Sequence, residues 1–225
     1  MNIKKNDYFD IDIIDIGING EGIGKIDNFT VFVEGALPNE KVNIKIIKVK
    51  KNYGYGKLIK ILIPSPFRKE PICEHFGKCG GCNLLHLDYN EQLNIKSNFI
   101  QSNLKKIAKI ENIKVPKAIG MDKPFNYRNK ASFPINFTDK VNIGFYKPRS
   151  HNIINIDNCI IQNPINNVII EKTREFIKES NISIYDENTG KGDLRHIVTR
   201  IGNKTNELLI CFVINNNKFL YKDLL

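Results

Sequence analysis

Four of the five cysteines in this chain have the spacing of a metal-binding cluster. A C-x5-C-x2-C arrangement is followed, after a long interval, by a fourth cysteine: the set is Cys73, Cys79, Cys82 and Cys159. Four thiolates can complete the coordination of an iron-sulfur cluster or of a zinc ion. The pair Gly80-Gly81 allows a tight turn that brings backbone amides near sulfur and suits a bulky cubane, whereas zinc more usually binds two separate C-x2-C pairs. The spacing therefore predicts a metal centre, with iron-sulfur and zinc both open.

The other side chains of this chemical type have simpler explanations. The fifth cysteine, Cys211, lies within the apolar run Leu208–Ile214, where burial would make a thiol unreactive, so we expect it to pack in a core. His75 and His86 lie close to the cysteines in sequence. Because four thiolates already complete a metal site, we expect structural or supporting roles for both histidines.

Lysine and tyrosine side chains concentrate in one N-terminal segment. The formal net charge of the chain is +10, which favours a polyanionic partner, although lysine is common throughout. Residues 41–60 hold seven lysines and no acid, with two tyrosines among them. Cations interleaved with aromatic rings are typical of surfaces that bind single-stranded nucleic acid. The candidate nucleic-acid contacts in this half of the chain are Lys25, Lys48, Lys50, Lys51, Tyr53 and Tyr55.

A small β-barrel is predicted to position these lysines and tyrosines. Apolar and acidic residues alternate over Phe9–Ile13, and the phase then shifts by one residue, as a bulge in a curved strand requires. The four glycines within Gly17–Gly24 favour a mobile hairpin, because no helix pattern follows them as a nucleotide-binding loop would need. Strand patterns return at Phe29–Val33 and at Val42–Ile46. We expect this barrel to form the first domain, residues 1–62.

The second predicted domain, residues 63–225, carries the cysteines. A proline-rich linker leads into the cysteine loop, and a helical spacing of apolar residues runs from Tyr89 to Ile110. Further on we expect strands at Ala131–Phe137, Val141–Tyr146 and Ile153–Ile156, a helix at Asn166–Lys178 and a buried strand at Leu208–Ile214. The predicted fold class is therefore β plus α/β: a barrel followed by a mixed α/β domain with a mainly antiparallel sheet.

Motifs in both predicted domains resemble a known family. The run Val31-Phe-Val33, followed by Ala36-Leu-Pro-Asn-Glu40, resembles the TRAM domain, an OB-like barrel that binds RNA. The rest of the chain resembles the TRAM-bearing RNA uracil-5-methyltransferases of the ribosomal RNA type. Besides the four cysteines, the motifs that carry this resemblance are Ser65-Pro66, His86-Leu87, Gln92-Leu93, Lys96, Tyr127-Arg-Asn-Lys130, Gly144-Phe145, Ser150-His151, Asp157 and Arg195-His196 with Arg200.

The resemblance implies a cofactor, a partner and further contacts. It implies that the four clustered cysteines hold a [4Fe-4S] cluster, that ribosomal RNA is the partner and that S-adenosylmethionine is the methyl donor. It also implies RNA contacts in the second domain, by Arg128, Lys130, Arg195 and His196. Methyl transfer of this type needs a cysteine thiolate that adds to C6 of uracil and a base that removes the C5 proton.

The resemblance places those catalytic groups, and the S-adenosylmethionine site, in a Rossmann-like domain C-terminal to everything in this sequence. Residues 217–225 read as the start of a helix whose apolar side chains need a partner, and the helix over 89–110 is expected to expose an apolar face in the same way. We therefore expect the chain to bind RNA and to transfer no methyl group on its own.

Two other functions fit parts of the pattern. One is a stand-alone RNA-binding protein on the same scaffold. The other is a TRAM-bearing methylthiotransferase or radical enzyme, which the spacing disfavours because such enzymes use C-x3-C-x2-C with one iron site open. No apolar run is long enough to span a membrane, and the N-terminus has no apolar signal core, so we expect a cytoplasmic protein. The sequence does not define the oligomeric state, and we expect a monomer.

Overall fold

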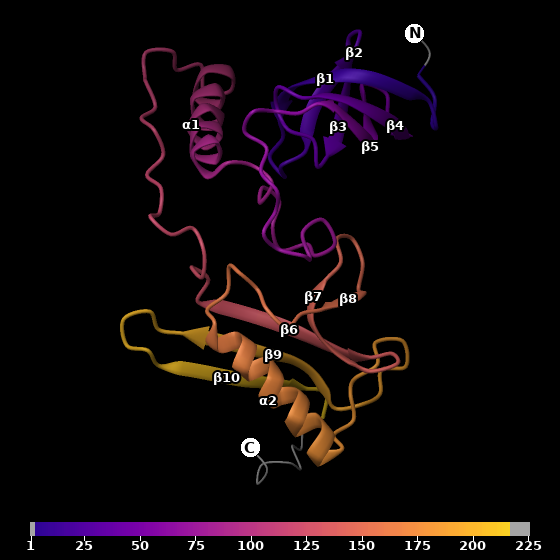
Figure 1. Ribbon diagram of the computed structural model, residues 1–225, viewed down its shortest axis with the longest axis vertical. Coiled ribbons are helices and arrows are strands. Elements are labelled where there is room, and N and C mark those ends of the chain that lie inside the picture. Colours follow the sequence, from indigo (N-terminus) through magenta and orange to yellow (C-terminus); the bar gives the residue numbers. More distant parts are fainter. Residues whose placement is uncertain (1–2, 217–225) are drawn as a thin grey trace. The chain divides into compact units, whose positions relative to one another are not determined.

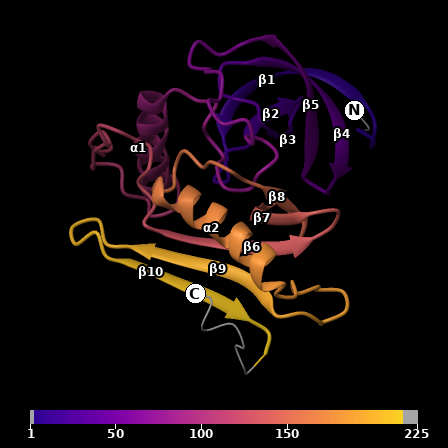
Figure 2. The same ribbon diagram turned by 60° about the horizontal axis from the view of Figure 1, so that its bottom comes forward.

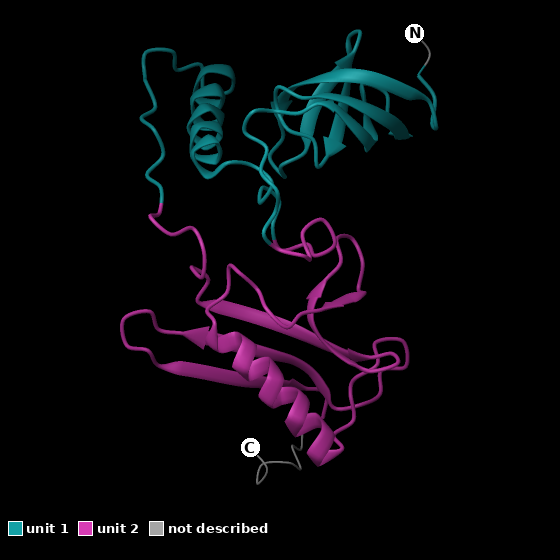
Figure 3. Cartoon of the chain, in the orientation of Figure 1, with its two compact units in different colours: residues 1–72, 82–120 teal, residues 73–81, 121–225 magenta. Residues whose placement is uncertain are grey.

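The computed structural model describes residues 3–216 (Figure 1; turned view in Figure 2). These residues form two compact units (Figure 3). The barrel unit comprises the chain up to Ile72 together with Cys82–Gly120, and the sheet unit comprises Cys73–Gly81 with the described residues from Met121 onward. The sequence had placed the helix after Tyr89 in the second domain, whereas the structure groups it with the barrel. The domain boundary at residue 62 stays a prediction.

Five strands of the barrel unit close into a barrel. They are β1 (Tyr8–Ile16), β2 (Gly22–Ile26), β3 (Phe29–Glu34), β4 (Lys41–Val49) and β5 (Tyr53–Ile63), in the order β1-β2-β3-β5-β4. All neighbours are antiparallel except β3 and β5, which run parallel. Alternate residues point inward, so Val31, Val33 and Ile44 are fully buried. The predicted barrel is confirmed, and so is its bulge, because the β1–β2 register shifts between Ile13 and Asp15.

Two glycines of the β1–β2 hairpin belong to the wall of the barrel. Gly22 and Gly24 lie at buried positions of β2. A Cβ on Gly22 would lie 2.8 Å from the carbonyl oxygen of Ala36, and one on Gly24 would lie 2.7 Å from Cδ1 of Ile11. Only residues without a side chain allow so close an approach. The expectation of a mobile hairpin is therefore wrong for these two glycines, which serve packing.

A buried ion pair fixes the linker after β5 to the barrel. Nε of Arg68 donates to Oε1 of Glu40 at 2.6 Å, and Nη2 donates to Oε2 at 2.9 Å and to the carbonyl of Gly35 at 2.7 Å. The N–H groups of Leu37 and Ser65 donate to the same carboxylate. Burial alone would raise the pKa of Glu40, but these hydrogen bonds outweigh it and hold the pKa below its ordinary value. The linker is thus anchored along its length.

His86 is buried beside this ion pair. Its side chain is only 2% exposed, and burial together with the charge of Arg68 lowers its pKa to about 4. Backbone hydrogen bonds from Lys69 N–H to the carbonyl of His86, and from Asp88 N–H to the carbonyl of Phe67, both 2.9 Å, bring the two segments together. The structural role expected for His86 is therefore found at the barrel.

Helix α1 (Tyr89–Lys106) starts where the sequence predicted and ends four residues before the predicted end at Ile110. Asp88 caps its N-terminus by accepting hydrogen bonds from the next turn. Leu93 is buried, whereas Ile100 and Ile107 are 52% and 78% exposed, which agrees with the expected exposed apolar face. No helix in the described part of the chain is long and apolar enough to cross a membrane.

The sheet unit packs one helix on an antiparallel sheet. Its elements are β6 (Lys130–Phe137), β7 (Val141–Tyr146), β8 (Ile153–Asn155), α2 (Ile165–Ser180), β9 (Leu194–Ile201) and β10 (Leu208–Ile214), with sheet order β10-β9-β6-β7-β8. Helix α2 lies across one face of the sheet (Figure 2). Its Ile169, Ile170 and Ile177 pack in one core with Phe133 and Ile197 of the sheet. These strands and α2 lie where the sequence predicted, except β9, which it did not assign.

The exposure of β10 differs from the prediction of a buried strand. Leu208, Leu209 and Ile210 are 41%, 61% and 40% exposed, and Cys211 is exposed as well. The physical reason is position: β10 is an edge strand, paired only with β9 among the described residues. Cys211 is therefore not silenced by a core, and that expectation is wrong. The predicted helix at 217–225 lies outside the described residues.

Candidate nucleic-acid interface

Three aromatic rings cluster on the outside of the barrel. The ring centroids of Phe32 and Tyr53 lie 5.7 Å apart, those of Phe32 and Tyr55 5.8 Å, and those of Tyr53 and Tyr55 5.7 Å. Strand alternation produces the cluster: the inward neighbours on β5 are Gly54 and Gly56, where a Cβ would lie within about 3 Å of barrel atoms. The glycines let the barrel close while the rings stay outside.

The strand register places lysines on both sides of these rings. Lys25 pairs with Thr30, which pairs with Tyr53. On the other side, Lys48 of β4 pairs directly with Tyr55. Side chains of directly paired residues lie on the same face of a sheet. The rings are thus bracketed by cations across four neighbouring strands.

The β4–β5 turn adds two further cations. Lys50 and Lys51 form the turn, and the N–H of Lys50 donates to the carbonyl of Tyr53 at 2.8 Å. Both lysines are exposed. Four of the six residues predicted in this half therefore share one face of neighbouring strands with Phe32, and Lys50 and Lys51 lie in the adjoining turn. We call Lys25, Phe32, Lys48, Lys50, Lys51, Tyr53 and Tyr55 the aromatic-basic face.

The acidic residues of the barrel wall lie mainly on a different strand. Asp10 and Asp12 point outward from β1, where they pair with Asn43 and Lys41 of β4. The amide of Asn43 donates to Asp10 at 2.6 Å. The aromatic-basic face itself contains four lysines and no acid, and its rings are exposed (Tyr53) or half-buried (Phe32 and Tyr55). Such a surface can attract phosphates and stack bases.

The predicted cysteines are grouped in part. Cys73, Cys79 and Cys159 belong to the sheet unit, and Cys82 is the first residue of the returning segment of the barrel unit. Burial raises the pKa of the Cys79 thiol; the Gly81 N–H, which donates to its sulfur at 3.3 Å, opposes this, and the charges of Cys159 and Cys73 raise the pKa further. Cys73 and Cys159 are therefore close enough to Cys79 for their charges to act on it.

The turn around these thiols uses a different glycine from the one expected. Gly77 has φ of 76°, the left-handed region that favours glycine, whereas Gly80 makes a close approach: its N–H donates to the carbonyl of Tyr146 at 3.2 Å. Among residues 3–216, no three Cys, His, Asp or Glu side chains form a ready metal site. The metal centre thus stays a prediction. His75 lies in this turn, where its imidazole contacts Glu74.

The four predicted RNA contacts of the sheet unit do not form one group. Arg128 lies near the cysteines, where its charge lowers the pKa of Cys79 against the stronger effect of burial. Lys130 is exposed at the start of β6. The guanidinium of Arg195 stacks over the ring of Tyr185 at 4.3 Å. His196 lies 3.4 Å from the hydroxyl of Tyr146.

Several residues of this neighbourhood were not among the predicted contacts, although two of them lie in motifs of the family resemblance. Phe32 completes the aromatic cluster, and only the strand period, which puts it opposite in phase to Val31 and Val33, could have shown that it faces outward. In the sheet unit, His151 contacts Glu187 at 2.7 Å and its ring lies 5.6 Å from that of Tyr146. No local pattern links these positions, because they come together through the sheet.

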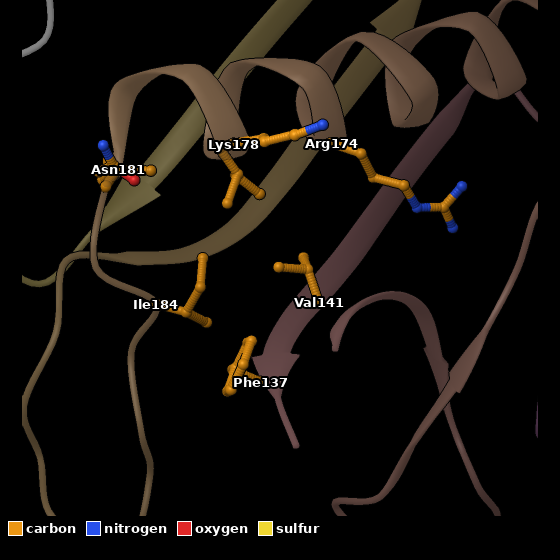
Figure 4. Close-up of a pocket in the computed structure, with 8 residues that line it drawn as sticks. Phe137, Val141, Arg174, Lys178, Asn181 and Ile184 are labelled. Atoms are coloured by element: carbon orange, nitrogen blue, oxygen red, sulfur yellow. The ribbon is translucent and has the colours of Figure 1, made fainter. Parts of the chain in front are cut away.

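A pocket of about 490 Å³ lies near the C-terminal end of α2 (Figure 4). Val141 and Ile184 contribute apolar surface, and Arg174 and Lys178 stand on the helix above them (Figure 4). The Arg174 guanidinium is already bound to Asp157 at 2.7 Å. The lining residues include no thiol, imidazole or carboxylate. Its cationic side chains, Arg174 and Lys178, are the only ionisable groups among the lining residues.

Comparisons with known proteins agree with a nucleic-acid role. The TRAM domain family matches residues 4–59. An uncharacterized RNA methyltransferase of Clostridium tetani is 46% identical over 222 residues, which is 98% of this chain and 48% of that protein. One of Listeria innocua is 42% identical over 98% of this chain and 49% of its own length.

A solved structure matches across both units. The crystal structure of the Pyrococcus abyssi tRNA (uracil-54, C5)-methyltransferase in complex with S-adenosyl-L-homocysteine has a TM-score of 0.69 and 26% identity, and the match covers 93% of this chain and 47% of that one. The chain spans about half the length of the curated relatives it matches. It carries a TRAM domain, and RNA methyltransferases are its homologues over 98% of its own length.

Proposed function

We propose that this chain is the RNA-recognition part of an RNA uracil-C5 methyltransferase that uses S-adenosylmethionine. The aromatic-basic face of the barrel carries the proposal, because it combines exposed rings with cations in the way that single-stranded RNA requires. The names of the relatives support RNA methylation, and the Pyrococcus abyssi enzyme supports uracil C5 as the position. The activity, the substrate and the partners of the whole protein are part of what we propose.

Binding by the barrel is tested with three lysines of the face. In Lys48→Ala/Lys50→Ala/Lys51→Ala the affinity for single-stranded RNA should fall, and the slope of log affinity against log salt should shrink by about 2, since each neutralised phosphate contributes about 0.7. The matched control removes three exposed lysines near the end of α1: Lys105, Lys106 and Lys109. Equal losses in both variants would contradict a specific face.

Ribosomal RNA is the substrate class that we propose, on the motif pattern of the chain. Transfer RNA is the competitor, because the structural neighbour acts on tRNA. Competition binding with ribosomal RNA fragments and with total tRNA separates the two. Tighter binding of tRNA would reverse the assignment while leaving the RNA-binding role intact.

We also propose that Cys73, Cys79, Cys82 and Cys159 hold a [4Fe-4S] cluster. The chemistry of the donor set supports it: the charges of Cys73 and Cys159 act on the Cys79 thiol, and a backbone N–H already points at the Cys79 sulfur. A cluster there would cross-link the 73–82 loop to Cys159. Anaerobically purified protein should be brown with about four irons per chain. Cys159→Ala should then lower thermal stability more than Cys211→Ala, and colourless protein with one zinc would contradict the cluster.

The proposal keeps the methyl-transfer chemistry outside these residues. With S-adenosylmethionine and ribosomal RNA, the chain alone should produce no 5-methyluridine. Because Cys211 is exposed, its thiol has to be tested directly and not dismissed as buried. Methylation that disappears in Cys211→Ser would identify this thiol as a nucleophile. It would contradict the proposal that methyl transfer lies outside these residues.

A further inference from the structure

The sheet of the sheet unit has a second, more open face. Helix α2 covers the face that carries Phe133 and Ile197, so the residues that alternate with these point the other way. Direct strand pairs place Lys130 with Arg200, Ser132 with Val198, and Pro134 with His196 on that side. Tyr146 of β7 joins them through its hydroxyl contact to His196 at 3.4 Å. We call Lys130, Ser132, Tyr146, His196, Val198 and Arg200 the open sheet face.

Two cations oppose each other at one end of this face. Lys130 and Arg200 are direct cross-strand partners, both are exposed, and like charges in that arrangement repel. Neither side chain forms an ion pair with any described residue. On the far side, Arg200 pairs with Leu209 of β10. The outward positions of β6, β7, β9 and β10 carry no acid. An anion is therefore the ligand that would relieve this repulsion.

Two rings lie at the other end of the face. Pro134, the partner of His196, is four residues from Lys130, which corresponds to about 13 Å along a strand. Tyr146 is 39% exposed, and the nearby carboxylate of Glu187 is bound by His151. Burial and the charge of Arg195 lower the pKa of His196, which keeps this ring neutral at neutral pH. This end of the face therefore offers two neutral rings.

We propose that the open sheet face binds a single-stranded segment of RNA, with Lys130 and Arg200 on phosphates and a base against Tyr146 and His196. A single strand presents both phosphates and unpaired bases, whereas a duplex presents its bases stacked and paired. This inference rests on the proposed RNA-binding function and adds a second contact surface, on a different unit from the aromatic-basic face.

The charged end is tested by removing its two cations. Lys130→Ala/Arg200→Ala should weaken binding of a single-stranded RNA of about 12 nucleotides roughly tenfold and reduce the salt slope by about 1.4. The matched control is Lys172→Ala/Lys178→Ala. It removes two exposed charges from α2, the helix that covers the opposite face of the sheet. It should change affinity less than about twofold.

The ring end is tested by separating stacking from the hydroxyl. Tyr146→Leu should weaken binding at least about fivefold, and Tyr146→Phe should keep wild-type affinity, because stacking needs the ring and not the hydroxyl. A hairpin duplex of the same composition should respond to neither substitution. Circular dichroism of each variant checks that the sheet is intact.

The outcomes distinguish this inference from the proposed function. If the wild-type chain binds no RNA, both are wrong. If it binds RNA, loses it with the Lys48, Lys50 and Lys51 substitutions and is unaffected by changes at Lys130, Arg200 and Tyr146, only the open sheet face is wrong. Self-association that Leu209→Asp abolishes, with RNA affinity unchanged in the Lys130→Ala/Arg200→Ala variant, would mean that a second copy of the chain covers this face.

Discussion

The barrel and the sheet use similar strands under different constraints. Every barrel strand has a neighbour on both sides, so its inward side chains are buried completely, as Val33 and Ile44 are. The sheet ends at β10, whose first four side chains are exposed although β10 is the most apolar of the described strands. The position of a strand, with a neighbour on both sides or at an edge, therefore affects which apolar residues become core, and composition alone does not decide it.

Among these substitutions, removal of the buried carboxylate of Glu40 should lower the stability of the barrel most. Glu40→Ala leaves the Arg68 guanidinium without its carboxylate, and the loss should be about 4 kcal/mol of barrel stability. Hydrogen exchange of amides in β1–β5 and in β6–β10 measures the two units separately. The exposed pair of His151 and Glu187 is the control, since Glu187→Ala should cost less than about 0.5 kcal/mol. Similar losses of stability in Glu40→Ala and Glu187→Ala would contradict the difference expected between a buried and an exposed ion pair.

The same substitution in both units tests the core directly. Ile44→Ala should destabilise the barrel by about 3 kcal/mol, because the side chain is fully buried and leaves a cavity. Ile210→Ala, at a residue 40% exposed on β10, should cost less than about 1 kcal/mol. Urea denaturation followed by hydrogen exchange provides both values. A cost at Ile210 as large as that at Ile44 would mean that β10 is covered in solution.

Acid should destabilise the barrel unit through His86. The pKa of His86 is lowered to about 4 in the fold from an ordinary 6.5, so between these values the unfolded chain binds more protons and stability falls as pH falls. The loss from pH 7 to pH 5 should be about 2 kcal/mol. Below its ordinary value of 4.5, protonation of Glu40 adds to the loss, since its folded pKa is lowered. His86→Leu should flatten the dependence of barrel stability on pH between pH 7 and pH 5. An unchanged dependence would exclude His86 as the group responsible.

The sequence predicted what local periodicity controls. Strands β1, β3 and β4, the bulge after Ile13 and helix α2 follow from alternating or helical spacing of apolar residues, whereas β2 and β5, which are rich in glycine, were not assigned as strands. Strand β9 was not predicted because its alternation is interrupted by a bulge at Arg195. Val213 of β10 pairs with His196 and Ile214 pairs with Leu194, so Arg195 has no partner in this strand pair.

Long-range contacts could not be predicted in the same way. His86 lies four residues from Cys82 in sequence, yet it packs beside Glu40 and Arg68 because the linker folds back on the barrel. The lysines and tyrosines of the aromatic-basic face were found from composition alone. That they share one surface depends on the pairing of Lys48 with Tyr55 and of Thr30 with Tyr53, which only the register defines.

The division of the chain has a consequence for how such a protein can be cut and recombined. The segment Cys73–Gly81 leaves the barrel unit, belongs to the sheet unit and then returns at Cys82. A single breakpoint after Gly120 would therefore separate the sheet unit from its own cysteine loop, and Cys159 from Cys73 and Cys79. Exchange of either unit between genes needs coordinated breakpoints on both sides of this loop. The two units are consequently expected to be inherited together, as one block, and not shuffled as independent modules.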